Sequence, residues 1–251
     1  MTGSSRGIGR AIALELAEAG AEIVIHGCVH QAEAQEVAMA IRERGGKSQR
    51  LMADLSCPEN QDRLVDEAWS DGPVDIWINN AGADVLTGQV AREPFETRLR
   101  RLWQVDVHAT MRMSRAVGQR MACRGRGVIL NMGWDQALTG MAGDSGQMFA
   151  ASKGAIMAFS LSLAKSLAPR VRVNCLAPGW IRTAWGEAAP PAWQQQAKGE
   201  SLLGRWGTPA DVAQVARFLV SNEGSFINGQ IIPINGGLAG ACRQLEPQPG
   251  K

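Results

Sequence analysis

Apolar residues recur along the chain in two patterns that differ in period. Short apolar runs of strand length occupy residues 22–26, 48–56, 75–82, 127–133, 171–179 and 230–233. Longer segments carry apolar residues about three or four positions apart, as on one face of a helix, and occupy residues 10–20, 31–44, 60–69, 94–124 and 149–167. Strands that alternate with helices in this way are typical of a parallel sheet covered on both faces. The pattern therefore predicts an α/β fold with a doubly wound parallel sheet.

The chain opens on a glycine-rich loop, TGSSRGIG, that runs directly into the first helical segment. Gly3, Gly7 and Gly9 would allow the backbone to approach a pyrophosphate closely, and the helix N-terminus would add free N–H groups and a positive dipole end. A glycine-rich turn without a ligand is the alternative. A helix and then a strand follow at once, which favours a dinucleotide site.

The place of this loop at the start of the chain predicts a missing element. A loop of this kind leaves the carboxyl end of a central strand, yet only Met1 precedes it. We expect the first strand to be missing or truncated at the N-terminus, with the true start upstream. Without that strand, two neighbouring strands would keep unpaired inner edges and the core would contain a hole.

Length and composition fit a single folded unit. The chain has 251 residues, of which 45% are hydrophobic and 20% charged, enough for one large core. We expect one domain over residues 1–238, which binds both cofactor and substrate. A loose C-terminal tail is expected over residues 239–251.

Charge and cysteine content narrow the classes of partner. A net charge of +2 is too small to indicate nucleic acid or membrane binding, and the basic run Arg98, Arg100 and Arg101 is expected to coat a solvated helix face. The five cysteines form no CxxC pair, so the sequence indicates neither a disulfide framework nor a metal site, and a cytoplasmic location is expected. No apolar run reaches the ~18 residues of a membrane span.

The strand expected at residues 22–26, which follows the first helix, indicates which dinucleotide the site would bind. An acidic residue at the end of this strand holds the ribose of NAD, whereas a basic residue accommodates the 2′-phosphate of NADP. The strand ends in HGCVH without Asp or Glu, and Arg6 in the first loop is placed to meet a phosphate. These features favour NADP over NAD. Asp54, near the end of the next apolar run, would meet the adenine, and capping of the following turn is an equal alternative.

Several motifs together resemble the short-chain dehydrogenase/reductase family. They are TGSSRGIG, NNAG, the helix with Lys153, APGWIRT, and RWGTPADVA followed by FINGQIIPINGG. The resemblance covers almost the whole chain and implies a single-domain Rossmann-like fold, a nicotinamide dinucleotide and a homo-oligomer, tetramer or dimer. With Arg6 and Asp54 added, the expected cofactor-binding residues are Thr2, Gly3, Ser5, Gly7, Ile8, Gly9, Asn79, Ala81, Gly82, Lys153, Pro178, Gly179, Ile181 and Thr183.

The catalytic positions depart from the family pattern. The family's catalytic set is Asn, Ser, Tyr and Lys, and by resemblance these positions fall on Asp106, Trp134, Phe149 and Lys153. Only the lysine is retained, and the chain contains no Tyr. About two more residues than usual separate the Ser position from the Tyr position.

These substitutions change what the site would do in a hydride transfer. The carbonyl oxygen gains negative charge and needs a proton donor. Phe149 has no hydroxyl, and the indole N–H of Trp134 is not an acid. Asp106, if it faces the site, would pair with Lys153. Asp135 is the candidate replacement acid, since burial against the indole would raise its pKa; a hydrogen bond to the loop backbone is an equal alternative.

Two further features have both a structural and a functional interpretation. Asp144 and Ser145 precede the expected helix start, where helix capping is favoured over catalysis. Four tryptophans lie in the segment that closes over substrate in the resembled family, where they would either line an apolar pocket with Trp134 or pack against the core: Trp180, Trp185, Trp193 and Trp206.

Two functions are consistent with these features. The first is an NADP-linked oxidoreductase that acts on a small, apolar carbonyl or alcohol with a relocated proton donor. The second is a dinucleotide-binding protein without catalysis, serving as a sensor or assembly partner. A non-redox enzyme is a third class, for which the sequence offers no nucleophile. Analogy at the level of the fold favours the first function, whereas the substituted positions favour the second.

Overall fold

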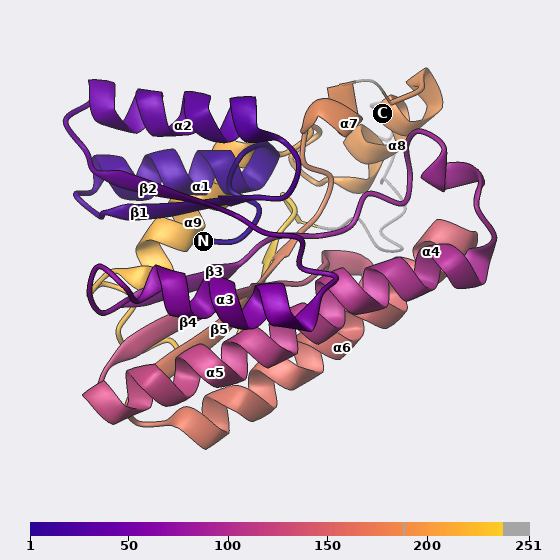
Figure 1. Cartoon of the computed structure of the whole chain (residues 1–251). Coiled ribbons are helices and arrows are strands. Elements are labelled where there is room, and N and C mark those ends of the chain that lie inside the picture. Colours follow the sequence, from indigo (N-terminus) through magenta and orange to yellow (C-terminus); the bar gives the residue numbers. More distant parts are fainter. Residues whose placement is uncertain (188, 238–251) are drawn as a thin grey trace, which may run out of the picture.

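The computed structural model of the chain describes residues 1–187 and 189–237. Within this part, helices and strands alternate as the apolar pattern predicts (Figure 1). The expected tail over residues 239–251 lies outside the described residues. None of the described helices is long and apolar enough to cross a membrane.

Every strand pair between residues 1 and 237 that the structure describes is parallel. One sheet pairs β1 (Ile23–Gly27) with β2 (Ser48–Met52). The other has the order β3-β4-β5-β6, whose strands are Ile76–Asn79, Gly127–Met132, Val171–Pro178 and Ile231–Ile234. Several strands are buried on both faces, which explains their continuous apolar runs. The predicted α/β class with parallel sheets is confirmed.

Two layers of helices cover the strands (Figure 1). One core, rich in Ile and Ala, lies beneath α1 (Gly7–Glu18), α2 (Gln31–Glu43) and α9 (Pro209–Val220). The other core lies beneath α3 (Pro58–Ala68), α5 (Ala109–Arg124) and α6 (Asp144–Leu167). The remaining helical segments are η1 (Val90–Arg92), α4 (Phe95–Leu102), η2 (Trp103–His108), η3 (Asp135–Ala137), α7 (Ala184–Glu187) and α8 (Pro191–Glu200). In Figure 1, α7 and α8 lie together at one end of the molecule.

Two helices differ from the sequence prediction. The segment expected as one helix over residues 94–124 contains a π-helical stretch, η2, between α4 and α5. Helix α6 begins at Asp144, five residues before the predicted start at Phe149. The earlier start is explained by packing, because Met148 is fully buried in a small apolar cluster beneath α4. Periodicity alone does not reveal this contact.

The first turn of α6 also corrects two expectations about charged residues. Asp144 makes no helix cap; its carboxylate accepts a hydrogen bond from Arg98 Nη2 at 3.0 Å. The Arg98 side chain is only 13% exposed, so this arginine ties α4 to α6 instead of coating a solvated face. The ion pair fixes the start of the helix that carries Lys153.

The boundary between the two sheets is the unusual feature of the fold. Residues 1–4 lie between β1 and β3, where Thr2 N–H donates to Ile78 O and Ser4 N–H donates to His26 O, both at 2.9 Å. Among the described residues no strand pairs with the inner edge of β1 or of β3. The expected unpaired edges are thus confirmed, and a groove follows them away from Met1.

Candidate cofactor and active site

The glycine-rich loop is held against the exit of β3 by contacts that require glycine. Gly3 has a φ of +61°, and a Cβ atom there would lie 2.7 Å from Ala81 Cα. A Cβ atom on Gly9 would lie 2.0 Å from the carbonyl oxygen of Gly3. Asn80 Nδ2 donates to that same oxygen at 2.8 Å. A side chain at Gly3 or Gly9 would therefore not fit in the contact between the loop and the exit of β3.

The N-terminus of α1 opens from this loop. Its N-cap residue, Arg6, has an extended backbone and makes no side-chain cap. The amide groups of the first turn are therefore not satisfied by a capping side chain and are free to bind an anion. The Arg6 side chain is exposed beside them. This arrangement fits the pyrophosphate and the 2′-phosphate of a dinucleotide.

His26 is a positioning residue that the sequence interpretation missed. Its Nδ1 accepts a hydrogen bond from Gly3 N–H at 3.1 Å, and its Nε2 lies 3.0 Å from Ala53 O. This geometry requires a neutral ring that carries its proton on Nε2. Burial lowers the pKa of His26 from 6.5 to about 4. The imidazole thus joins β1, the exit of β2 and the glycine-rich loop.

Protonation of His26 is expected to destabilise the fold. Between pH 6.5 and about pH 4 the unfolded chain binds a proton that the folded chain excludes, so the free energy of unfolding falls as the pH falls through this window. The loss is about 3 kcal/mol across the whole window, and none of it is expected above pH 6.5. Urea unfolding at pH 7 and at pH 4.5 measures the difference.

A His26→Gln variant is the control, because it removes the titrating group but keeps an acceptor and a donor. The amino group of Met1, whose pKa is also lowered by burial, to about 5, remains in both proteins. The variant is expected to lose less stability than the parent between the two pH values. Identical losses in both proteins would contradict the assignment.

Asn79, the last residue of β3, and Asn80, the residue after it, have opposite orientations. Asn79 is buried and donates to Ser114 Oγ and Asn131 Oδ1, both at 2.8 Å. Its side chain therefore belongs to a polar network inside the sheet, which corrects the cofactor contact expected of it. Asn80 faces the glycine-rich loop instead. Asp54 is exposed and accepts from Ser56 N–H at 2.9 Å, in agreement with the capping alternative.

Lys153 and Asp106 form a buried ion pair. Lys153 Nζ lies 2.8 Å from Asp106 Oδ2, and the two side chains are 11% and 2% exposed. The other carboxylate oxygen accepts from Ala83 N–H at 2.8 Å. Asp106 lies in the π-helical stretch η2, and such stretches are frequent at functional sites. The carboxylate therefore connects the lysine to the loop that follows β3, as the sequence predicts for the pair.

The lysine borders a cavity of about 470 Å³ at the carboxyl ends of the strands. Trp134 and Phe149 form one wall, with an edge-to-face contact between rings whose centroids lie 6.4 Å apart. Trp180 and Trp193 form another wall, with centroids 5.3 Å apart. Trp206 packs behind Trp180 and is buried. Trp134, Trp180 and Trp193 thus line the cavity, whereas Trp206 packs behind it, so both expected roles of the tryptophans occur.

The cavity brings together many of the residues expected at the site. Beyond the two aromatic walls and Lys153 it includes expected cofactor residues, namely Ile8, Pro178, Gly179, Ile181 and Thr183. It also includes Ser145, which was weighed with Asp144 between helix capping and catalysis, and three residues without a catalytic signal in the sequence: Leu86, Met141 and Pro190. Residues expected to bind the cofactor therefore line the same largely apolar cavity (the chamber) as the aromatic rings.

Asp135 lies behind the wall of this cavity. Its Oδ2 accepts from Asn235 Nδ2 at 3.1 Å, and a Cβ atom placed on Gly179 would lie 2.8 Å from the same oxygen. Burial raises the pKa of the Asp135 carboxyl. The side chain is thus partly buried, as expected, but its Oδ2 faces the loop after β6, and Asp135 is not among the residues that line the chamber. The orientation corrects the sequence prediction.

Similar proteins share this architecture over nearly the whole chain. A family profile described as "Enoyl-(Acyl carrier protein) reductase" matches residues 3–239. The 3-oxoacyl-[acyl-carrier-protein] reductase FabG of Aquifex aeolicus (strain VF5) is 35% identical in an alignment of 248 residues, and the match covers 95% of this chain and 95% of that protein.

Two solved structures show the same fold. A 3-oxoacyl (acyl-carrier-protein) reductase from Agrobacterium tumefaciens C58 with NADP bound has a TM-score of 0.85 and 32% identity, and covers 94% of this chain and 92% of its own. The angucycline C-6 ketoreductase LanV with bound NADP has a TM-score of 0.83 and 30% identity, over 94% and 93% of the two chains. The chain therefore belongs to the short-chain dehydrogenase/reductase family of oxidoreductases.

Proposed function

We propose that the protein is an NADPH-dependent reductase of an apolar carbonyl compound and that Lys153 supplies the proton. One observation carries the proposal: Lys153 is the only titratable side chain among the described residues that line the chamber. The phenol and hydroxyl positions of the family hold Phe149 and Trp134. A donor at this place is needed because hydride addition makes the carbonyl oxygen basic.

NADP is the proposed cofactor because the glycine-rich loop and the start of α1 offer groups that can bind its phosphates. The uncapped N-terminus of α1 and the exposed Arg6 are matched to anions, and no acidic residue follows β1. Both solved structures described above contain NADP. The chamber is bordered by Lys153 and by four expected cofactor residues, which would hold the nicotinamide end against it: Pro178, Gly179, Ile181 and Thr183.

The proposed substrate is an apolar ketone or aldehyde, preferably with an aromatic ring. Rings of Trp134, Phe149, Trp180 and Trp193 surround the chamber, and polar groups are few. Aromatic walls favour a planar apolar ligand through stacking and edge contacts. The comparison with an angucycline ketoreductase agrees with this substrate class.

The proposed reaction balances with a single proton donor. The hydride for the carbonyl carbon would come from NADPH when it is bound. The carbonyl oxygen takes a proton from Lys153 Nζ and becomes a hydroxyl, and the lysine regains a proton from solvent. Asp106 holds the lysine beside the chamber throughout, because its two oxygens are fixed by Nζ and by Ala83 N–H.

A cofactor titration followed by a carbonyl panel tests the proposal. We expect saturable NADPH binding and oxidation of NADPH with aromatic ketones or aldehydes. Asp135→Asn, a change outside the chamber wall, is expected to keep turnover within about threefold, since the variant still bonds to Asn235. Binding without turnover on any carbonyl would overturn the reductase and leave the dinucleotide-binding protein. A turnover abolished by Asp135→Asn, with NADPH binding intact, would move the donor to Asp135.

We also propose an oligomeric state and a cellular location for the protein. We infer a homo-oligomer, tetramer or dimer, from the family to which the chain belongs. A reducing cytoplasm is the proposed location, since the cysteines in the described part of the chain, including the exposed Cys28 and Cys123, are free thiols.

A further inference from the structure

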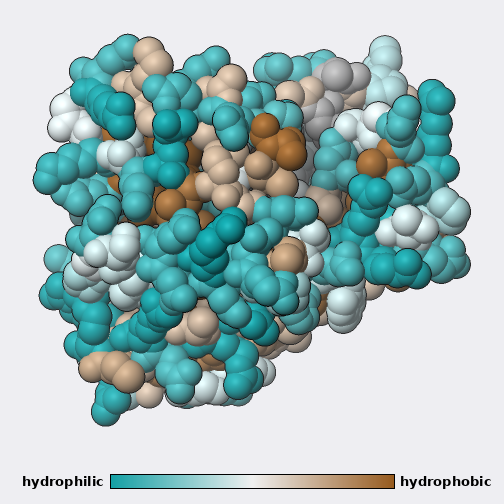
Figure 2. Space-filling view, in the orientation of Figure 1, coloured by the Kyte–Doolittle hydropathy of each residue, from teal (hydrophilic) through white to brown (hydrophobic). Residues whose placement is uncertain are grey.

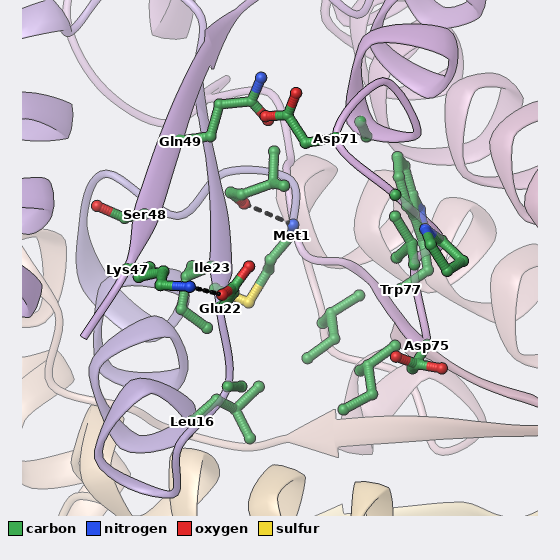
Figure 3. A pocket seen from close by; sticks show the side chains of 18 of the residues that line it. Met1, Leu16, Glu22, Ile23, Lys47, Ser48, Gln49, Asp71, Asp75 and Trp77 are labelled. Carbon is green, nitrogen blue, oxygen red and sulfur yellow. Dashed lines mark hydrogen bonds and ion pairs between the residues drawn. The ribbon is translucent and has the colours of Figure 1, made fainter.

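The chamber beside Lys153 and the groove beside Met1 differ in the charge of their walls. The groove holds the ion pair of Lys47 with Glu22, and Asp71 also lines it (Figure 3). On the described lining of the chamber, Lys153 is the only charged side chain. Figure 2 shows a mostly hydrophilic face of the molecule, so the largely apolar chamber differs from the outer surface as well. The chamber therefore suits a neutral ligand with few polar groups.

Three residues of the chamber follow one another along one face of α6, a helical turn apart: Ser145, Phe149 and Lys153. Ser145 lies in the first turn of the helix, eight positions before Lys153. At about 1.5 Å per residue, their Cα atoms are about 12 Å apart along the helix axis. The three side chains thus form a row with a polar group at each end and an aromatic ring in the middle.

Ser145 carries the free hydroxyl of this row. It is half-buried, and its hydroxyl has no hydrogen-bond partner within the part of the chain that the structure describes. The indole N–H of Trp180, another lining residue, donates to Glu200 Oε2 at 2.7 Å. Thr183 lies at the cofactor end, since a Cβ atom on Gly7 would lie 3.4 Å from its Cγ2. A ligand that extends from Lys153 past Phe149 therefore meets a hydroxyl that can both donate and accept.

The charges beside Ser145 indicate which polar group fits there. Asp144 precedes it and is exposed, and its carboxylate is paired with Arg98 Nη2 at 3.0 Å. An anionic substituent at Ser145 would meet this carboxylate and no unpaired cation on the described lining. A neutral hydroxyl group would not be repelled, and it can pair with the serine in either direction.

The spacing of the row sets the size of the ligand. For side chains that leave the helix in parallel, two hydrogen bonds of about 2.8 Å each leave about 6–7 Å between the two oxygen atoms of the ligand. One aromatic ring with its two substituents on opposite sides spans this separation. The ring would then lie against Phe149, between the two polar ends of the row.

We propose that Ser145 binds a hydroxyl group of the substrate, on the side of an aromatic ring opposite the carbonyl group at Lys153. The substrate class thereby narrows to hydroxylated aromatic ketones and aldehydes. Ser145 determines specificity and takes no part in the proton transfer, because it lies two helical turns from the lysine. This inference rests on the proposed function, since the carbonyl group has to lie beside Lys153.

The test compares para-hydroxyacetophenone with para-methylacetophenone, whose substituents are similar in size. Calorimetric titration with NADP⁺ bound gives a Kd for each ketone, and the ratio of the two values is the hydroxyl preference. We expect this preference to be about 3–10-fold larger in the parent than in Ser145→Ala, the effect of one neutral hydrogen bond. Each ratio is taken within one protein, so effects of the variant that are common to both ketones cancel. Ser145→Thr retains a hydroxyl and is expected to restore most of the preference.

Ser166→Ala is the matched control, since it removes an exposed serine hydroxyl from the same helix, and it should keep the hydroxyl preference of the parent. Equal preferences in the parent and in Ser145→Ala would overturn the proposal, as would the failure of both ketones to bind. Tighter binding of para-carboxyacetophenone than of para-hydroxyacetophenone would also overturn it, because the site would then suit an anion.

The binding measurements separate this proposal from the proposed reaction. A hydroxyl preference that depends on Ser145, without oxidation of NADPH by either ketone, would support the hydroxyl site and count against the reductase. Oxidation of NADPH by both ketones, with a preference that Ser145→Ala leaves unchanged, would overturn the hydroxyl site and leave the reductase in place.

Discussion

Replacing Lys153 with methionine is expected to lower turnover by roughly 10²–10⁴-fold, the range typical of a lost general acid. The ammonium group is the only titratable group on the described lining of the chamber, so no neighbouring side chain there replaces it. The loss is expected in kcat, because apolar contacts with the substrate remain. Steady-state kinetics on the best carbonyl substrate measures the effect. A change confined to the KM for NADPH would instead show that the lysine only holds the cofactor.

The same substitution is expected to destabilise the protein, and the two effects have to be separated. Asp106 would be left as a buried carboxylate without its cation, which costs about 3–5 kcal/mol. Tm is therefore expected to fall by roughly 10 °C. Adding Asp106→Asn removes the unpaired charge and is expected to restore most of the Tm but none of the turnover.

Lys165→Met is the matched control, since it changes an exposed lysine in the last turn of the same helix. It is expected to leave both turnover and Tm close to those of the parent. A Lys153→Met/Asp106→Asn double variant that regained turnover together with stability would exclude the lysine as proton donor.

The order of strands and helices was predictable because it depends on local periodicity. Continuous apolar runs mark strands that are buried on both faces, and the glycine-rich loop marks the start of α1. The start of α6 was not predictable. It depends on Met148 packing under α4 and on the Arg98–Asp144 ion pair, contacts between segments far apart in sequence.

The site was predictable where a helix fixes the spacing and not where a loop does. Phe149 and Lys153 lie one turn apart on α6, so both reach the same cavity. Asp135 was misplaced because its orientation depends on Asn235, which is 100 positions away in sequence. A cofactor contact was predicted for Asn79, but Asn80 is the residue that faces the glycine-rich loop. Neighbours at a strand end face opposite sides, and the sequence does not say which side faces the loop.

Replacing Phe149 with tyrosine is expected to raise kcat, by up to roughly 10²–10⁴-fold. Phe149 lines the chamber one helical turn before Lys153, so a hydroxyl on its ring would enter the same space. A nearby ammonium favours the ionised form of a phenol and lowers its pKa, which makes the new group a better acid near neutral pH. The gain should appear in kcat on the same carbonyl panel. It should also bring a new ionisation into the pH profile of kcat, which the parent lacks.

Trp134 determines how much of this gain is realised. Its indole ring makes an edge-to-face contact with the ring of Phe149 and fills the position at which the family has a serine. If the indole blocks the carbonyl, Phe149→Tyr alone gives little and the double variant with Trp134→Ser gives the full increase. A large gain from the single variant would show that the indole leaves room for substrate. Phe218→Tyr adds a hydroxyl to the 41% exposed ring of Phe218 on α9 and should change nothing. A double variant that folds, binds NADPH and still shows no increase would mean that the missing phenol is not what limits the reaction.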